Sequence, residues 1–267
     1  MGIGGAATAL FGTAHAEAAP LPTGGFGKSV LDWGVQPNAD RDQSAALQKA
    51  IDELSSMGQP VFIPAGRYLV AKLQLPANAA VFGVPGLSVL NGPKGAPVFE
   101  CVNKQDVSLR GLSFIGNGLA ARECRNLTIS ECRVNSSDGD GIVCGGSGLL
   151  VSNNRAASCA RSAIWVEGDG MVTNNFISGA GQFGLRLGAL NRLGILSVNN
   201  NMIDGTAVGI AVSNADDGYA LITMNMITGA KGGGIRALNG DELIGKDLTK
   251  GGSEAFRNLA IVVNVSI

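Results

Sequence analysis

A short pattern of apolar and polar positions recurs from residue 129 onward: an aliphatic residue, two further residues, an asparagine, one residue and an apolar residue. The asparagine position is occupied by Cys132 in the first copy and by Asn154, Asn175, Asn201 and Asn225 in the next four. These positions are 22, 21, 26 and 24 residues apart. A second feature keeps step with the first, because an aliphatic residue follows each of these positions after 9 or 10 residues. These residues are Ile142, Ile164, Leu185, Ile210 and Ile235. Two features that stay in phase over five copies indicate an internal repeat.

The length of the repeat predicts the architecture. About 22 residues are too few for a strand–helix–strand unit but enough for one coil of short strands and turns. A single coil cannot bury its own apolar side chains, so neighbouring coils stack and their parallel strands pair at a spacing of about 4.8 Å. We therefore expect an all-β fold, a parallel β-helix whose aliphatic residues form inward columns.

The recurring asparagines would lie above one another at a tight turn of this solenoid. Asparagine tolerates left-handed backbone angles, and its amide can bond the amide or backbone of the next coil. Buried polar groups need such partners. We therefore predict a structural ladder made of Asn154, Asn175, Asn201 and Asn225, with no chemical role.

One segment before the repeats has a helical period. Apolar residues recur there at i, i+3, i+4 and i+7, namely Leu47, Ala50, Ile51 and Leu54. Asp42 is a suitable N-cap, and Gly58 follows Met57 where a helix end favours a left-handed residue. We expect a helix from Asp42 to Met57 that covers the first coil and protects an open sheet edge.

Composition and charge exclude several classes. The 267 residues carry 20 basic and 21 acidic side chains, so a basic nucleic-acid binder is disfavoured and no nucleic-acid partner is expected. With 45% hydrophobic and 15% charged residues the chain can form a core, which argues against disorder. No run of 18 apolar residues occurs, so we expect no membrane span. The 40 glycines fit short strands separated by turns.

The N-terminus has the character of an export signal. Residues 2–19 are small or apolar except for His15 and Glu17, and Ala14-His15-Ala16 fits a cleavage site. We divide the chain into a signal-peptide remnant (1–19), an N-terminal segment with the capping helix (20–58) and the β-helix repeats (59–267). The five cysteines have irregular spacing and no histidine follows His15, so we expect buried thiols and no zinc site.

Three segments resemble the N-terminal signature of pectate-lyase-like right-handed parallel β-helix proteins: Asp32–Pro37, Asp42–Asp52 and Val61–Tyr68. The chain is also similar to the twin-arginine-translocated β-helix repeat proteins of bacteria. This resemblance implies right-handed winding, an N-terminal cap, export machinery as a partner of the leader, and a periplasmic or extracellular location. It implies no particular reaction, and the twin-arginine pair itself is absent because no basic residue precedes Lys28.

The residue after each inward aliphatic position points outward. On successive coils these residues are Val143, Trp165, Arg186, Ala211 and Arg236. We expect Trp165 and Arg186 to be neighbours, with Glu167 on the same face. An exposed tryptophan beside an arginine suits stacking on a sugar ring and pairing with a carboxylate. We interpret this outward face as a substrate-binding site formed by Trp165, Arg186 and Arg236.

Catalytic candidates surround that face. A polygalacturonase-like hydrolase is disfavoured, because its family pattern needs a histidine that is missing after His15. A polysaccharide lyase needs carboxylates to hold Ca²⁺ and an arginine as base. The candidate catalytic residues are Asp138, Asp140, Arg161, Glu167 and Arg186. Asp140 and Glu167 are the residues considered for Ca²⁺, which is the one cofactor that the sequence suggests.

The sequence thus predicts an exported β-helix protein that binds or processes an acidic polysaccharide at the cell envelope. Two alternatives stay open: a Ca²⁺-assisted polyuronate lyase, and a non-catalytic surface rod. Catalysis and binding alone both fit the residues.

Overall fold

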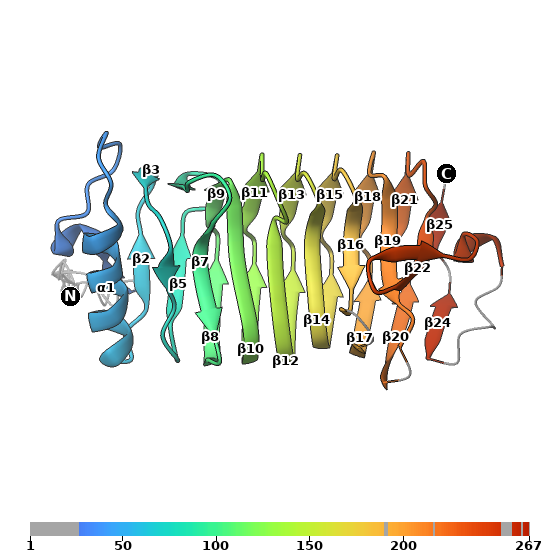
Figure 1. Cartoon of the computed structure of the whole chain (residues 1–267). Coiled ribbons are helices and arrows are strands. Elements are labelled where there is room, and N and C mark those ends of the chain that lie inside the picture. The colour runs from blue at the N-terminus through green and yellow to red at the C-terminus, as the bar shows by residue number, and fades with distance from the viewer. Residues whose placement is uncertain (1–26, 190–191, 216, 252–257, 263, 267) are drawn as a thin grey trace, which may run out of the picture.

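The computed structural model describes residues 27–189, 192–215, 217–251, 258–262 and 264–266. Within them the chain winds as a right-handed parallel β-helix, a rod of stacked coils in Figure 1. Strands of each coil pair with the equivalent strands of the coils before and after, which confirms the fold that the repeat predicted. The predicted signal-peptide remnant, residues 1–19, lies outside the described residues.

The first part of the chain contains β1 (Lys28–Ser29), the 3-10 helix η1 (Val30–Trp33), α1 (Ser44–Ser56), β2 (Val61–Ile63), β3 (Gly66–Leu69), β4 (Leu73–Gln74), β5 (Ala80–Gly83), β6 (Ser88–Asn91), β7 (Pro97–Val102), β8 (Gln105–Arg110) and β9 (Ser113–Ile115). The middle contains β10 (Asn117–Ser130), β11 (Arg133–Asn135), β12 (Ile142–Ser152), β13 (Arg155–Ala157), β14 (Ser162–Thr173), β15 (Phe176–Ser178), β16 (Phe183–Leu187), β17 (Arg192–Asn199) and β18 (Met202–Asp204). The last part contains β19 (Val208–Ser213), β20 (Asp217–Thr223), β21 (Met226–Thr228), β22 (Ile235–Asn239), β23 (Glu242–Ile244), η2 (Leu248–Lys250), β24 (Leu259–Val262) and β25 (Val265–Ser266).

These strands form two sheets. The first has 16 strands, and its long members turn a corner: β10 pairs with β7 through residues 117–122 and with β8 through residues 125–130. The second sheet is made of short strands, in the order β25, β21, β18, β15, β13, β11, β9, β6 and β3. Its nine strands are separated by eight steps, so the winding makes about eight full turns.

The inward columns form the core. Pairing places Ile142, Ile164, Leu185, Ile210 and Ile235 one above another, and each is at most 1% exposed. Burial of each such side chain contributes about 1.5–3 kcal/mol. The five cysteines are also free and buried, as expected from the sequence.

The asparagine ladder lies at the turn before the second sheet, and its four predicted members are each 1% exposed. The amide nitrogen Nδ2 of Asn175 donates to Oδ1 of Asn201 at 3.0 Å, and Oδ1 of Asn175 accepts the backbone N–H of Asn154 at 3.0 Å. The ladder has a further rung that the sequence analysis did not include. Oδ1 of Asn264 accepts the backbone N–H and the side-chain amide of Asn225 at 2.9 and 3.0 Å.

Helix α1 covers the N-terminal end of the coils, as predicted (Figure 1). It spans Ser44–Ser56 with Gln43 as its N-cap, one residue after the N-cap expected at Asp42. The Gln43 side chain bonds the backbone of Gln36, while Oδ1 of Asp42 accepts the N–H of Ser44 at 2.8 Å. Asp42 therefore makes a capping contact from one position before the N-cap. In the part of the chain that the structure describes, no helix is long and apolar enough to cross a bilayer.

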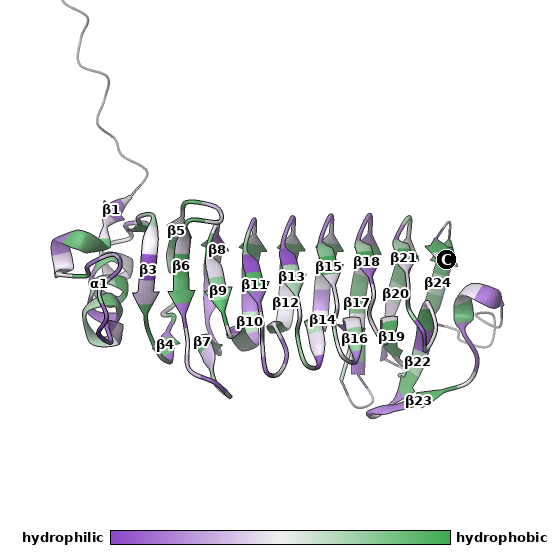
Figure 2. Cartoon of the chain, turned by 90° about the horizontal axis from the view of Figure 1, so that it is seen from above, coloured by the Kyte–Doolittle hydropathy of each residue, from purple (hydrophilic) through white to green (hydrophobic). Residues whose placement is uncertain are grey.

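A hairpin near the C-terminal end interrupts the regular winding. Strands β22 and β23 pair in antiparallel fashion. Figure 1 shows β22 close to β19, and Figure 2 shows β23 projecting from the side of the rod. A small apolar cluster lies outside the main core there, formed by Phe183, Val208, Ala211 and Leu238. The outward face of β16, β19 and β22 is therefore partly covered, whereas the sequence analysis expected it to be open.

Candidate functional site

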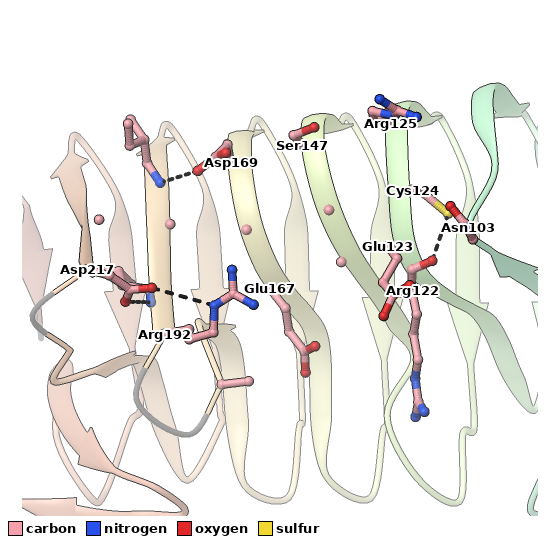
Figure 3. A pocket seen from close by; sticks show the side chains of 18 residues that line it. Asn103, Arg122, Glu123, Cys124, Arg125, Ser147, Glu167, Asp169, Arg192 and Asp217 are labelled. Carbon is pink, nitrogen blue, oxygen red and sulfur yellow. Dashed lines mark hydrogen bonds and ion pairs between the residues drawn. The ribbon is translucent and has the colours of Figure 1, made fainter.

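A groove runs along the corner where the long strands bend, and we call it the corner groove (Figure 3). It has a volume of about 810 Å³. Its lining comes from equivalent positions of successive coils: Asn103, Arg122–Arg125, Gly145–Ser147, Glu167–Asp169, Ala189, Arg192–Ile195, Asp217 and Gly218. It therefore follows the long axis of the solenoid.

A column of four glycines forms the floor of the corner groove. Gly146, Gly168, Gly194 and Gly218 have φ angles of 136, 132, 81 and 89°. A Cβ atom on Gly168 would lie 1.9 Å from the carbonyl oxygen of Gly146, and one on Gly218 would lie 2.3 Å from that of Gly194. Only glycine allows the coils to approach this closely. The corner is hollow because these positions carry no side chains.

Charged side chains of both signs line the corner groove. Oδ2 of Asp217 lies 3.5 Å from Nε of Arg192, and Oδ1 of Asp169 accepts the N–H of Ile195 at 2.7 Å. Arg122 and Arg125 are exposed, and their guanidinium groups make no hydrogen bond or ion pair within the described ranges. Two positive charges are thus available to a ligand.

Glu167 is the half-buried carboxyl group of this groove. Burial raises the pKa of Glu167, while the positive charges of Arg122 and Arg186 partly oppose that rise. A raised pKa keeps part of the carboxyl population protonated closer to neutrality. Such a group can donate or accept a proton at a bound substrate. In Figure 3, Arg122 and Glu167 lie on the same side of the groove.

Most of the remaining predicted residues line a second depression of about 520 Å³, which we call the tryptophan pocket. It contains Asp140, Arg161, Trp165, Arg186 and, from the β22–β23 hairpin, Asp241 and Leu243. Pairing of β14 with β16 places Trp165 beside Arg186, as predicted. The guanidinium carbon lies 4.2 Å from the centre of the indole ring, a favourable cation–π geometry.

The groups of the tryptophan pocket are bonded to one another. Nε1 of Trp165 donates to the carbonyl oxygen of Gly188 at 2.9 Å, and Arg186, which is 8% exposed, forms an ion pair with Asp241. Asp140 pairs with Arg161 at 2.6 Å. One face of the indole is therefore occupied by Arg186, which differs from the free stacking surface that the sequence suggested. The cause is the hairpin, since Asp241 holds the guanidinium in place.

Three predicted residues lie outside the tryptophan pocket. Glu167 follows Trp165 by two residues but lines the corner groove, because the strand reaches its bend at Gly168. Asp138 accepts the N–H of Gly95 at 2.8 Å. The Arg236 guanidinium donates to the carbonyl oxygens of two nearby glycines, at 2.8 and 2.9 Å.

The two carboxylates considered for Ca²⁺ line different depressions. Oδ1 of Asp140 accepts the N–H of Ser162 at 2.9 Å and its other oxygen pairs with Arg161. Glu167 lines the corner groove instead of the tryptophan pocket, although the charges of Arg186 and Asp140 still act on its pKa. Among the residues that the structure describes, no three histidine, cysteine or acidic side chains form a group suited to a metal ion. In the described part of the chain, Asp140 and Glu167 thus belong to no group of three or more such side chains.

The corner groove was missed by the sequence analysis, although the sequence carries a signal for it. The glycines of its floor are 22, 26 and 24 residues apart, which is the period of the repeat itself. A third feature in phase with the asparagines and the aliphatic residues marks a position where neighbouring coils approach. Arg122 and Arg125 lie on the coil before Gly146, next to Cys124, which pairs with this first glycine of the column.

Comparisons with known proteins agree with this architecture. The model of the family described as rhamnogalacturonase A/epimerase, pectate lyase-like, matches residues 28–249. An iota-carrageenase of Zobellia galactanivorans is 28% identical over 94 residues, which is 33% of this chain and 19% of that protein. The chain therefore matches about a fifth of the length of this curated relative.

Solved structures share the fold. The A-module of a mannuronan C-5 epimerase from Azotobacter vinelandii has a TM-score of 0.56 at 17% identity, over 89% of this chain and 95% of that one. The tailspike protein of the E. coli bacteriophage HK620, in complex with a pentasaccharide, has a TM-score of 0.64 at 14% identity, over 89% and 50%. Identities this low establish the shared fold alone. The family match covers most of the chain, and the protein therefore belongs to the pectate-lyase-like rhamnogalacturonase A/epimerase family.

Proposed function

We propose that the protein binds an acidic polysaccharide along the corner groove and that Glu167 takes part in processing it. One observation carries the proposal: a groove built from equivalent positions of successive coils holds two unpaired arginines, and one of them, Arg122, acts on a carboxyl group of raised pKa. A surface that repeats along an axis suits a ligand that repeats along its own length. A linear polysaccharide is such a ligand.

Two arginines of the corner groove suit an acidic polymer. Arg122 and Arg125 have no partner among the described residues, so neither has to leave an ion pair in order to bind a ligand. Arginine donates two parallel hydrogen bonds to a carboxylate, which makes it the side chain suited to a uronate unit. The acidic groups Asp169 and Asp217 bond backbone N–H groups or Arg192, which lessens their repulsion of the ligand.

Processing would use Glu167 together with an arginine. Elimination and epimerisation of a uronate both begin when a base removes the proton beside the carboxylate, and neutralisation of that carboxylate makes the proton more acidic. Arg122 can neutralise the carboxylate and Glu167 can transfer the proton. The two groups replace the calcium cluster of the lyase alternative, for which the described residues supply no assembled site.

The relatives support a polysaccharide ligand. By their names, a carrageenase, a mannuronan epimerase and polygalacturonases from Erwinia carotovora and Thermotoga maritima act on polysaccharides. The tailspike structure holds a pentasaccharide. The fold shared with these proteins, together with this chain's place in a pectate-lyase-like family, makes a polysaccharide the favoured ligand class for this chain.

The proposal includes export by the twin-arginine route and action at the cell envelope. Its support is the small-residue leader before Lys28 and the resemblance to exported repeat proteins. Expression of the natural reading frame, followed by separation of periplasm and cytoplasm, tests it. A processed protein in the periplasm is expected, and an unprocessed protein retained in the cytoplasm would refute it.

The ligand proposal is tested by affinity electrophoresis in gels that contain polygalacturonate, alginate, carrageenan or neutral dextran. Retardation is expected with acidic polymers and should weaken as salt is added. Arg122→Gln should reduce affinity about tenfold, which corresponds to about 1.4 kcal/mol. Arg133→Gln removes an exposed charge from the second sheet and should bind as the wild type does. Equal losses in both variants would show a mere effect of net charge and contradict the assignment.

Processing is tested on every polymer that binds. Unsaturated products are followed by absorbance, and epimerisation by NMR of the polymer. Glu167→Gln should abolish turnover while the polymer still binds. Binding without product in the wild type would leave a binding protein and refute the role of Glu167, and no binding at all would favour the structural rod.

A further inference from the structure

Two sulfur atoms lie together under one end of the corner groove. The Sγ atoms of Cys101, on β7, and Cys124, on β10, are 3.4 Å apart. Both side chains are at most 1% exposed, and Cys124 belongs to the groove lining. Figure 3 shows the Cys124 sulfur beside Asn103. The two residues belong to neighbouring coils, so a bond between them would join one coil to the next.

The corner of β10 brings Cys124 to this position. In the pairing of β10 with β7, Cys101 lies opposite Ala121, three residues before Cys124. The pairing of β10 with β12 shifts its register between Ala121 and Cys124, and Glu123 in between has a φ of 53°. The strand therefore bends, and Cys124 turns back over Cys101.

The remaining three cysteines lack this arrangement. Their thiols contact backbone oxygens: Cys132 that of Ser130 at 3.3 Å, Cys144 that of Trp165 at 3.7 Å and Cys159 that of Ala157 at 3.8 Å. Burial raises the pKa of Cys132 to about 12 and that of Cys159 to about 12, so these thiols stay protonated. A hydrogen bond from the Cys101 thiol instead lowers the pKa of Cys124, so the pair offers one thiolate and one proton donor.

We infer that Cys101 and Cys124 form a disulfide bond when the protein meets a disulfide oxidant, and that this bond links two coils at the end of the corner groove. The sulfur atoms need to approach by about 1.4 Å to reach a normal S–S distance of about 2.0 Å. The site takes a small or protein-borne disulfide as its reactant. This inference is independent of the proposed polysaccharide ligand.

The chemistry balances as thiol–disulfide exchange. The Cys124 thiolate attacks one sulfur of the oxidant, which forms a mixed disulfide and releases the other half of the oxidant as a thiolate. That thiolate takes up from the solvent the proton that Cys124 had given to it. Cys101 then attacks Sγ of Cys124 and releases the second thiol, which takes the Cys101 proton. Two protein thiols are oxidised and one disulfide of the oxidant is reduced to two thiols.

The bond would stiffen the floor of the corner groove. The backbone of Cys124 lies directly against Gly146, since a Cβ atom on Gly146 would be 1.8 Å from the Cys124 carbonyl oxygen. Cys124 thus begins the column that Gly146 and Gly168 continue. A covalent link at Cys124 fixes the first coil of this column to the coil before it.

The test is refolding of the full chain in a glutathione redox buffer, followed by alkylation of free thiols, intact mass and peptide mapping. Refolding exposes every thiol to the oxidant, so access is equal for all five. Before alkylation, the expected product is lighter than the reduced chain by two hydrogen atoms. After alkylation, it carries three modified cysteines, and peptide mapping should find Cys101 joined to Cys124. Five alkylated cysteines, a link through Cys144, or a stable glutathione adduct on Cys124 would each overturn the inference.

Two variants sharpen the result. Cys101→Ser should lose the internal link and leave Cys124 alkylated or bound to glutathione. Cys132→Ser removes a buried thiol of the core whose hydrogen bonds, among the described residues, go to backbone oxygens, and it should keep the link. An internal disulfide that persists in Cys101→Ser, or that disappears in Cys132→Ser, would contradict the assignment.

Discussion

Removal of one inner rung of the asparagine ladder should cost far more free energy of unfolding than removal of its last rung. The Asn201 side chain donates to the carbonyl oxygen of Val172 and to Asn225, and its Oδ1 accepts the backbone N–H of Asn175. Asn201→Ala leaves the buried N–H of Asn175 without its acceptor. Each buried polar group left unpaired costs about 1–3 kcal/mol, so with two or more affected groups we expect a loss of about 3–5 kcal/mol.

Asn264→Ala is the matched control. Asn264 also accepts from the coil before it, at 2.9 and 3.0 Å, but it is partly exposed. Water can replace a lost partner there, so we expect a cost of about 1 kcal/mol. Urea unfolding followed by circular dichroism measures both variants. Equal costs, or a cost below about 1 kcal/mol for Asn201→Ala, would refute the claim that the ladder's buried bonds hold the coils together.

Three further predictions concern the groove and the hairpin. Burial raises the pKa of Glu167, so in that pH range the folded protein holds a proton that the unfolded chain has lost. The stability of the wild type should therefore fall as the pH rises from the ordinary glutamate pKa through the raised one. Thermal melts measured across this range should show the fall in the wild type but not in Glu167→Gln. Gly168→Ala should prevent folding or cost several kcal/mol, because its Cβ would overlap a backbone oxygen. Gly240 has open space around it and a φ of 60°, in the ordinary left-handed region, so Gly240→Ala should cost only about 1 kcal/mol by denaturant unfolding. Asp241→Asn should leave the charge of Arg186 unpaired and cost about 1–2 kcal/mol in the same assay, and an unchanged stability would contradict the role given to the hairpin.

The repeat in the sequence predicted the fold because stacking converts a spacing along the chain into a register between coils. Residues one repeat apart, such as Ile142 and Ile164, become direct neighbours when each coil pairs with the next. The ladder follows from the same rule. Asn264 fits that pattern too, and it is missing from the prediction only because its coil comes after the η2 segment, 39 residues beyond Asn225.

The candidate site was harder to predict, since it depends on departures from the repeat. Asp241 pairs with Arg186, which lies 55 residues earlier in the chain, because the β22–β23 hairpin brings it there. This hairpin is not part of the repeat, so the repeat could not predict it. Trp165 and Glu167 lie on either side of the buried Val166 and so point outward on one face, as alternation along a strand predicts. The two side chains nevertheless line different depressions, and the repeat alone does not predict that division.

The most direct test of the account is a measurement of affinity for the acidic polysaccharide after one groove position has been filled. Ser147 lines the corner groove and is partly exposed, so Ser147→Trp should block it; Ser178→Trp places the same side chain on the second sheet. Isothermal titration should show a loss of at least about tenfold for Ser147→Trp and an unchanged affinity for Ser178→Trp. Equal affinities in both variants and the wild type would show that the polymer binds elsewhere.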